Sequence, residues 1–168
     1  MKDHATLLLA AHDLIKLEPN VRFLCAGESS SEYAGYESKI RELSTKLELD
    51  EHVIWLGART DPERLMAACD ITTLTSDSGE GFPNSIAESM ACGTLCVATD
   101  IGDSAAIISD SRLVVSPKRH DHLAKAWNSL LSLNQSKLDD LGESMRQSII
   151  DRYSKSSITV LTLDALSR

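Results

Sequence analysis

Two glutamates eight positions apart are the residues of this sequence whose types and spacing could most directly do chemistry. Glu80 lies between Gly79 and Gly81, and Glu88 follows in the stretch "SDSGEGFPNSIAESMACGTLCVATDIGD". A glycine-rich loop that leads into a helix presents free backbone N–H groups and the positive end of the helix dipole, which suit a phosphate. On loop chemistry alone, the stretch is compatible with an anion site and equally with a plain turn.

Glu88 also has a purely structural explanation. Ser85 and Glu88 form an S-x-x-E pattern, which is typical of a capping box in which the glutamate reaches back to the first amide of its helix. By spacing, this explanation is at least as good as a ligand role. For Glu80 the only alternative is a solvated loop. Asn84 stands where a dinucleotide fingerprint needs its third glycine, so that fingerprint is not supported.

The elements that must position these glutamates alternate along the chain between short apolar strands and amphipathic helices. Strands are expected at residues 21–27, 52–57, 70–76, 94–100 and 112–116. Helices are expected at residues 5–18, 36–49, 61–69, 84–93, 120–133 and 137–168. Continuously apolar strands predict a parallel sheet covered on both faces. We therefore expect residues 1–168 to form one doubly wound, Rossmann-like α/β domain with a helical C-terminal tail.

In such a sheet, ligands bind at the carboxyl ends of the strands. That rule selects four loops, at residues 27–31, 57–60, 76–84 and 99–104. Doubly wound domains usually begin with a central strand, whereas this sequence begins with a helix. We therefore expect that a first strand is missing from it.

Composition excludes several classes of function. The formal net charge of −8 leaves no general basic face, so no nucleic-acid partner is expected. No apolar run reaches the ~20 residues of a membrane span, and the first residues do not form a signal peptide. The four cysteines lie in apolar segments without a CxxC pair, which is typical of reduced cysteines in the cytoplasm. His120 and His122 have no further His or Cys at ligand spacing, so neither a metal nor another cofactor is expected.

Residues 76–102 resemble the E-x7-E region of GT-B glycosyltransferases of the retaining family 4 type, which reads S-x-x-E-G-x-P-x-x-x-x-E-A-M-A-x-G-x-P-V-V-x-T-x-x-G-G. Further similar stretches are "KDHATLLLAAHDLI", "VRFLCAGE", "HVIWLGAR" and "DPERLMAACDITTLTS". The resemblance covers nearly the whole chain. It implies the C-terminal, nucleotide-sugar-binding half of a GT-B enzyme.

The resemblance also implies a role for each matching residue. Glu88 would bind the ribose hydroxyls of the donor and Glu80 the hydroxyls of the donor sugar, since a carboxylate can clamp a vicinal diol. Lys2 would stabilise charge on the leaving diphosphate. The backbone near the start of the helix would contact the sugar and the diphosphate, at Gly81, Phe82, Pro83, Asn84 and Ser85. The base would meet two loops that contain Gly27, Glu28, Ala58 and Arg59.

The sequence departs from the family pattern at several positions. The arginine partner of Lys2 would precede residue 1, and Leu95 replaces the usual proline. Asp103 stands at the second glycine, and Ser104 at the acidic position after it. The N-terminal acceptor domain is expected to be missing, so the isolated chain should bind weakly and turn over nothing.

The resemblance implies that the full enzyme transfers a sugar from a nucleoside diphosphate sugar to a glycan or lipid-linked acceptor, as in polysaccharide biosynthesis, and it allows peripheral membrane association. Two alternatives stay open: a non-catalytic nucleotide-binding or interaction module, and a nucleotide-sugar epimerase of the same architecture. The tail "SSITVLTLDALSR" would pack either on the missing half or on its own domain. Its apolar residues are Ile158, Val160, Leu161, Leu163 and Leu166.

Overall fold

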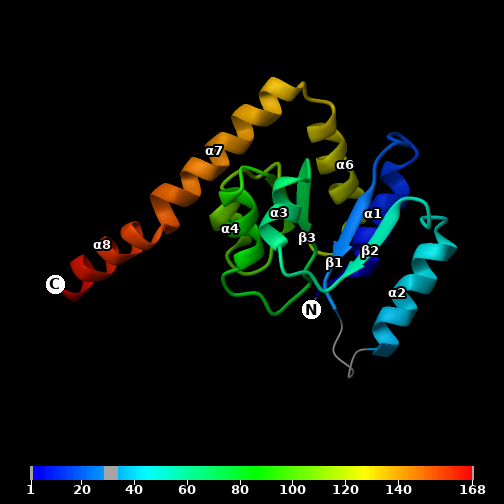
Figure 1. The fold of residues 1–168 in the computed structure, drawn as a ribbon, viewed down its shortest axis with the longest axis horizontal. Coiled ribbons are helices and arrows are strands. Elements are labelled where there is room, and N and C mark those ends of the chain that lie inside the picture. Colours follow the sequence, from blue (N-terminus) through cyan, green and yellow to red (C-terminus); the bar gives the residue numbers. More distant parts are fainter. Residues whose placement is uncertain (1, 29–33, 168) are drawn as a thin grey trace.

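The structure is a computed structural model that describes residues 2–28 and 34–167. Strands and helices alternate in the expected order up to the fourth strand, after which a short helix that was not expected precedes the fifth strand (Figure 1). The strands are β1 (Phe23–Ala26), β2 (Val53–Gly57), β3 (Ile71–Leu74), β4 (Leu95–Thr99) and β5 (Val114–Val115). The helices are α1 (His4–Leu14), α2 (Ala34–Lys46), α3 (Pro62–Ala67), α4 (Asn84–Ala91), α5 (Ser104–Ile108), α6 (His120–Leu131), α7 (Gln135–Tyr153) and α8 (Lys155–Leu166).

The strands form two parallel sheets rather than the single sheet expected. β1 pairs with β2 in one sheet, and the other has the order β3-β4-β5. The expectation that both faces are covered is also wrong for the smaller sheet. Leu24 of β1 and Ile54 of β2 are 41% and 45% exposed. Every residue of β4, in contrast, is buried.

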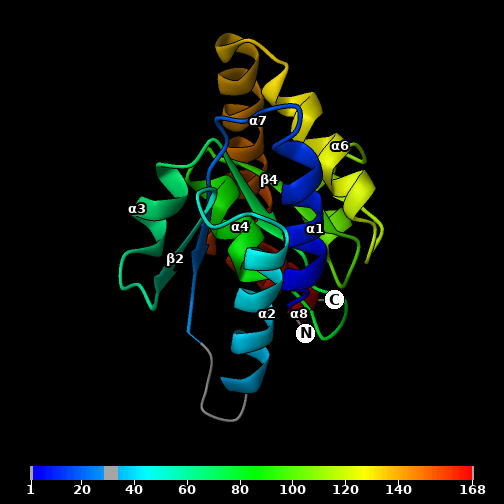
Figure 2. The ribbon, with the colours of Figure 1, turned by 90° about the vertical axis from the view of Figure 1, so that its right-hand side faces the viewer.

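Two apolar clusters follow this division, and α1 contributes to both. The larger cluster surrounds β4 and includes residues of α4, α6 and α7. The smaller cluster joins β2 to α2 through residues such as Ile40, Leu49 and Val53. α1 lies between α2 and α6, so it connects the two clusters (Figure 2). Its Ala10 and Leu14 belong to the larger cluster, and its Leu8 and Ala11 to the smaller.

The C-terminal tail differs from the single helix expected. Ser154 adopts an extended conformation between α7 and α8, and its hydroxyl accepts a hydrogen bond from the Ser157 N–H at 3.2 Å. α8 extends away from the rest of the molecule (Figure 1) and contains no buried residue. Its apolar side chains, of which Leu166 is 80% exposed, therefore do not pack on their own domain.

Candidate functional site

The chain between β3 and α4, residues 76–83, is the centre of the candidate site and is called the site loop below. Residues 2 and 3 are attached where it begins. Lys2 forms an isolated antiparallel bridge with Ser76, and the Asp3 N–H donates to the Thr75 carbonyl at 3.1 Å. The Asp3 side chain in turn accepts from the Thr6 N–H at 3.1 Å and so caps α1. Residues 2–3 are thereby fixed at the carboxyl end of β3.

The Glu80 carboxylate of the site loop is held by two hydrogen bonds. Its Oε1 accepts hydrogen bonds from the Lys2 ammonium and from the buried Ser76 hydroxyl, and its side chain is only 16% exposed. The hydrogen bond from Lys2 and then that from Ser76 hold the pKa of the Glu80 carboxyl below its ordinary value of 4.5. Glu80 and Lys2, both expected at the site, are therefore in contact, and the Glu80 carboxyl is ionised near neutral pH.

Three residues to which the sequence assigned no individual role hold this pair in place, although Ser76 and Gly102 lie in the loops selected at residues 76–84 and 99–104. Ser76 donates to Glu80, and the Tyr36 hydroxyl of α2 donates to the Lys2 carbonyl at 3.1 Å. Gly102 has a φ of +59°, and a Cβ there would lie 2.6 Å from the Glu80 carbonyl oxygen. The neighbouring Asp103 N–H donates to the Gly81 carbonyl at 2.9 Å. Gly102 could have been selected from the sequence, because it is a glycine just after β4. Only glycine lets the backbone there lie so close to the backbone of Glu80 and Gly81.

Glu88 is not part of a capping box. α4 begins at Asn84 after the N-cap Pro83, which places Ser85 inside the helix, and no side chain caps this end. Glu88 is exposed, and its side chain forms no hydrogen bond or ion pair within the described part of the chain. The structural explanation for Glu88 is therefore not realised, and its carboxylate is available to a ligand.

The other expected residues of the site loop differ in exposure. Pro83 is buried, Ser85 is half-buried, and Gly81 and Asn84 are exposed. The Phe82 ring packs against Tyr153 of α7, with ring centroids 5.2 Å apart. The first amides of α4 have no side-chain cap, and this end of the helix is suited to an anion.

The residues expected to meet the base form a separate group at the end of the smaller sheet. The Gly27 N–H donates to the Gly57 carbonyl at 2.8 Å, which joins the loops that contain Glu28 and Ala58. Arg59 forms two hydrogen bonds, of 2.9 and 2.8 Å, with Asp61 just before α3. Among the described residues, no hydrogen bond or ion pair joins this group to Glu80. Of the expected loop at residues 27–31, residues 29–31 lie outside the described part of the chain.

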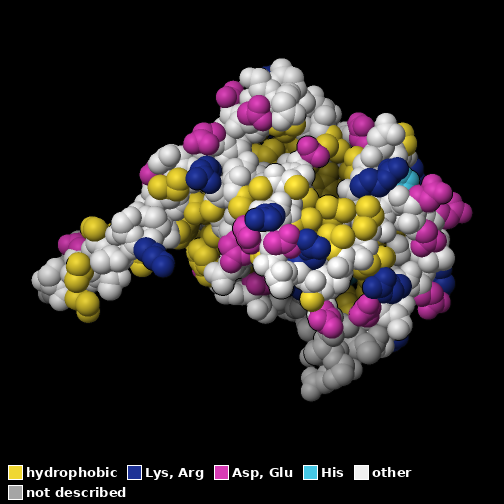
Figure 3. All heavy atoms as spheres, in the orientation of Figure 1, with side chains coloured by type: hydrophobic (Ala, Val, Ile, Leu, Met, Phe, Trp, Pro, Cys, Tyr) yellow, Lys and Arg dark blue, Asp and Glu magenta, His cyan; other side chains and the backbone are white. Residues whose placement is uncertain are grey.

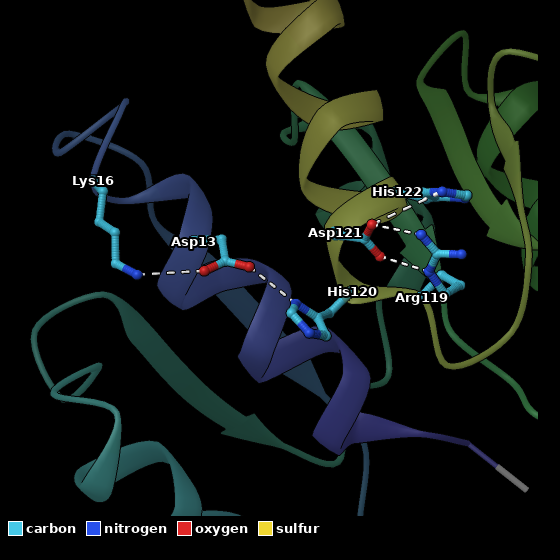
Figure 4. A network of polar contacts seen from close by, with 6 residues as sticks. All are labelled: Asp13, Lys16, Arg119, His120, Asp121 and His122. Carbon is cyan, nitrogen blue, oxygen red and sulfur yellow. Dashed lines mark hydrogen bonds and ion pairs between the residues drawn. The ribbon is translucent and has the colours of Figure 1, made fainter.

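The two histidines near the start of α6 each lie beside an aspartate (Figure 4). His120 Nδ1 lies 2.9 Å from Asp13 of α1, and Arg119 forms a bidentate pair with Asp121 at 2.8 and 2.7 Å. Within residues 2–28 and 34–167, no three His, Cys, Asp or Glu side chains are grouped so that they could hold a metal ion. The network instead links α1 to α6.

The cysteines are free thiols. Burial raises the pKa of Cys25 to about 11 and that of the fully buried Cys96 to about 11, and it also raises the pKa of Cys69. These three thiols stay protonated and unreactive at neutral pH. They serve as small apolar side chains, as their sequence context indicates.

The site loop and α4 present groups of the kinds that bind hydroxyls and phosphates. Glu80 offers an ionised carboxylate bonded to the Lys2 ammonium, Glu88 an exposed carboxylate within α4, and the start of α4 amides without a side-chain cap. Lys2 adds positive charge beside them. No helix within the described residues is long and apolar enough to cross a membrane.

The chain is similar over nearly its whole length to solved glycosyltransferase structures. HepE of Anabaena, solved in complex with UDP, matches with a TM-score of 0.90 and 26% identity, over 99% of this chain and 45% of that chain. TarM of Staphylococcus aureus matches with a TM-score of 0.84 and 26% identity, over 97% of this chain and 32% of that chain. The fold matches the C-terminal half of GT-B glycosyltransferases.

Curated relatives point the same way. The D-inositol 3-phosphate glycosyltransferase of Mycobacterium ulcerans is 32% identical over 120 residues, which are 69% of this chain and 26% of the relative. A Campylobacter jejuni 4-alpha-N-acetylgalactosaminyltransferase acting on a diphospho-undecaprenol is 31% identical over 59% of this chain and 25% of the relative. The chain thus spans well under half the length of these relatives. The family model described as "Glycosyl transferases group 1" matches residues 1–161, and the chain therefore belongs to this glycosyltransferase family.

Proposed function

We propose that this chain is the donor-binding half of a glycosyltransferase that takes a sugar from a nucleoside diphosphate sugar. The observation that carries the proposal is the arrangement around the site loop. An ionised, cation-bound Glu80 and a free Glu88 lie on either side of an uncapped helix start. A nucleoside diphosphate sugar has two diols separated by a diphosphate, which is the chemistry that this order of groups complements.

Each group has one proposed role. Glu88 binds the ribose hydroxyls and Glu80 the hydroxyls of the transferred sugar. Lys2 and the amides at the start of α4 neutralise the charge that develops on the leaving diphosphate. The loops with Gly27 and Ala58 contact the base. Lys2 already supplies a cation at this place, so the proposal includes no metal.

One relative supports a nucleotide sugar as the donor, and another supports a lipid-linked acceptor. HepE of Anabaena was also solved with UDP-glucose, with a TM-score of 0.86 and 25% identity to this chain. The Campylobacter relative is named for a lipid diphosphate acceptor. We propose that the acceptor is a glycan or a lipid-linked molecule and that the transferred sugar retains its configuration. We also propose that the protein functions in polysaccharide biosynthesis in the cytoplasm.

We propose that the exposed apolar residues of α8 pack on the acceptor-binding half of a longer protein. That longer protein would be peripherally attached to the membrane.

Calorimetric titration with UDP, GDP and ADP tests the ribose site. One nucleotide should bind, and Glu88→Gln should weaken it about ten- to hundredfold, because a charged hydrogen bond contributes about 1.5–3 kcal/mol. Glu143→Gln, on the exposed surface of α7, is the matched control and should change nothing. Binding that Glu88→Gln leaves unchanged in a folded protein would sink this assignment.

A second assay tests the reaction itself in the longer protein. A transferase consumes its nucleotide sugar only when an acceptor is present. Consumption with no acceptor, accompanied by a change in the sugar's configuration, would mean an epimerase. Binding without conversion under all conditions would mean a non-catalytic module.

A further inference from the structure

α7 lies alongside α4 and contacts the chain just beyond both ends of that helix. Gly142, in the first half of α7, lies against Gly93 just after α4, and a Cβ at Gly142 would collide with the Gly93 carbonyl oxygen. Tyr153, the last residue of α7, packs against Phe82, which precedes the N-cap of α4. The two helices are therefore antiparallel, and hydrophobic side chains gather where they lie side by side (Figure 3).

The two helices match in length over this stretch. From Gly142 to Tyr153, α7 rises by about 16 Å, since each helical residue adds about 1.5 Å. The eight residues of α4 rise by about 12 Å, so this stretch of α7 spans α4 and the residues on either side of it. Between its two ends, the Arg146 guanidinium donates to the Ala91 carbonyl, the last residue of α4. α7 thus holds α4 at its end as well as along its side.

Arg152, in the last turn of α7, joins α7 to α5. Its guanidinium donates to the Ala106 carbonyl at 2.7 Å and to the Ser109 hydroxyl at 2.9 Å. It also donates to the Tyr153 hydroxyl at 2.8 Å and lies 4.8 Å from the centre of that ring. Because a cation is attracted to the electrons of an aromatic ring, Arg152 restricts the orientation of Tyr153.

The contacts at the end of α7 form a closed ring with the site loop. Tyr153 packs edge-on against Phe82, with ring centroids 5.2 Å apart. Phe82 follows Gly81, whose carbonyl accepts from the Asp103 N–H at 2.9 Å, and Asp103 is the N-cap of α5. α5 in turn is bonded to Arg152. The site loop is therefore held from two directions, by the start of α5 and by the end of α7.

We propose that the end of α7 positions the site loop and the first amides of α4 for the diphosphate of the donor, with Tyr153 and Arg152 as positioning residues. This role rests on the proposed function, which assigns the diphosphate to these amides. Neither side chain has to touch the donor, because they act through the Phe82 ring and through α5. Since Phe82 is 41% exposed, the interior of the domain does not enclose its ring, and the contact with Tyr153 carries a larger share of its support.

Tyr153→Leu and Tyr153→Phe, compared in the longer protein, test this role. Leucine removes the ring that supports Phe82, whereas phenylalanine removes only the hydroxyl that accepts from Arg152. Tyr153→Leu should weaken UDP binding about two- to tenfold, because an aromatic pair contributes on that scale, and Tyr153→Phe should retain most of the affinity. Gln147→Ala, on the exposed face of α7 where Gln147 bonds to Asp151, is the matched control. Measurable UDP binding that Tyr153→Leu leaves unchanged would overturn the proposal.

Amide hydrogen exchange tests the same role without any nucleotide. The Asp103 N–H, bonded to the Gly81 carbonyl, reports how firmly the site loop is attached, and the Ala98 N–H, bonded to Leu113, reports the intact fold. In Tyr153→Leu the Asp103 amide should exchange about two- to tenfold faster while the Ala98 amide is unchanged. Faster Asp103 exchange in a protein that binds no nucleotide would reject the proposed function but retain the positioning of the loop. Unchanged Asp103 exchange would overturn the positioning role.

Phe82→Leu covers the case in which Tyr153→Leu does not fold, because Phe82 is partly exposed. It should speed Asp103 exchange by about the same factor, and Arg152→Met, which loses the bonds to α5, should act in the same direction. Where both leucine variants fold, the double variant should weaken UDP binding no more than either single variant, because the two rings act through one contact. Losses of affinity that multiply in the double variant would overturn the proposal, as would unchanged Asp103 exchange in Phe82→Leu.

Discussion

The two sheets of this molecule differ in how completely they are covered, and the candidate site is divided between them in the same way. The three-stranded sheet has the fully buried β4 and carries the site loop at the end of β3. The two-stranded sheet exposes Leu24 and Ile54 and carries only the loops expected to meet the base. The groups proposed to bind the sugar and the diphosphate are thus held by the better-packed half.

The halves meet at one point close to the site. Tyr36, on the helix of the smaller half, donates to the Lys2 carbonyl and accepts from the His4 N–H at 3.3 Å. Lys2 in turn bonds to Glu80 of the larger half. This contact is a direct route by which the packing of the smaller half can influence the site.

Replacing one buried leucine in each apolar cluster should give the largest effect, a loss in the free energy of unfolding. Leu123 of α6 and Leu49 after α2 are both 0% exposed, in the larger and the smaller cluster respectively. Leu123→Ala should lower the free energy of unfolding by about 3–5 kcal/mol and Leu49→Ala by about 2–3 kcal/mol, because the smaller cluster can collapse further around the cavity. Denaturant unfolding measures both. Equal losses in the free energy of unfolding would mean that the two clusters do not differ in how far they can collapse around a cavity.

Matched glycines sharpen the comparison at the site. Gly57 and Gly102 both have positive φ, +66° and +59°, but a Cβ at Gly57 would meet nothing within 4 Å. Gly57→Ala should therefore cost only about 1 kcal/mol of backbone strain. Gly102→Ala should cost about 1–3 kcal/mol through strain and overpacking, and it should also weaken binding of the nucleotide sugar by moving Glu80. Calorimetry that finds the same nucleotide-sugar affinity in both folded variants would show that Gly102 does not position the site loop.

Tyr36→Phe tests the contact between the halves. Losing one hydroxyl should lower the free energy of unfolding by about 1 kcal/mol and weaken nucleotide binding only slightly. Thermal unfolding and titration on the same samples measure the two effects. A large loss of binding with no loss of stability would mean that Tyr36 contacts the ligand itself.

The smallest expected effect is on the stability of the folded state at acidic pH. Because the pKa of Glu80 is held below 4.5, its ionisation stabilises the folded state fully above that value and loses this contribution as the pH falls through the lowered pKa. Lys2→Met should raise the pKa of Glu80 towards 4.5, so the variant should lose less stability than the natural chain on acidification. The difference should stay below about 1 kcal/mol, because the Lys2 side chain is half exposed and water screens the pair.

NMR titration of the Glu80 carboxyl checks the shift directly. Lys46→Met is the control, since Lys46 pairs with Glu42 on the exposed face of α2. An unchanged pKa of Glu80 in Lys2→Met would mean that Ser76 alone holds it down.

Sequence periodicity was sufficient for the order of the elements but not for their assembly. The helix expected at residues 61–69 is confirmed as α3, with Asp61 as N-cap and Pro62 in its first turn. The Asp61 carboxylate makes no capping bond because Arg59 binds it. α5 was missed because five residues are too few for a periodic pattern. The division into two sheets depends on which strand edges meet, and no local pattern records that.

The site shows the same limit. Glu80 and Glu88 could be selected from a local stretch, but the contact between Lys2 and Glu80 spans 78 positions. From the S-x-x-E pattern a capping box was as good an explanation of Glu88 as a ligand role. The position of Pro83 as N-cap decides against the box, because it moves Ser85 into the helix.

The most direct test of the proposed site compares UDP with UDP-glucose in the longer protein, with Glu80→Gln and Glu88→Gln beside the natural chain. If Glu88 holds the ribose and Glu80 the sugar, Glu88→Gln should weaken both ligands by the same factor. Glu80→Gln should weaken only UDP-glucose, by about ten- to hundredfold, since UDP has no sugar for Glu80 to bind. Equal loss of both ligands in Glu80→Gln, or no loss in Glu88→Gln, would contradict the division of the donor between the two glutamates.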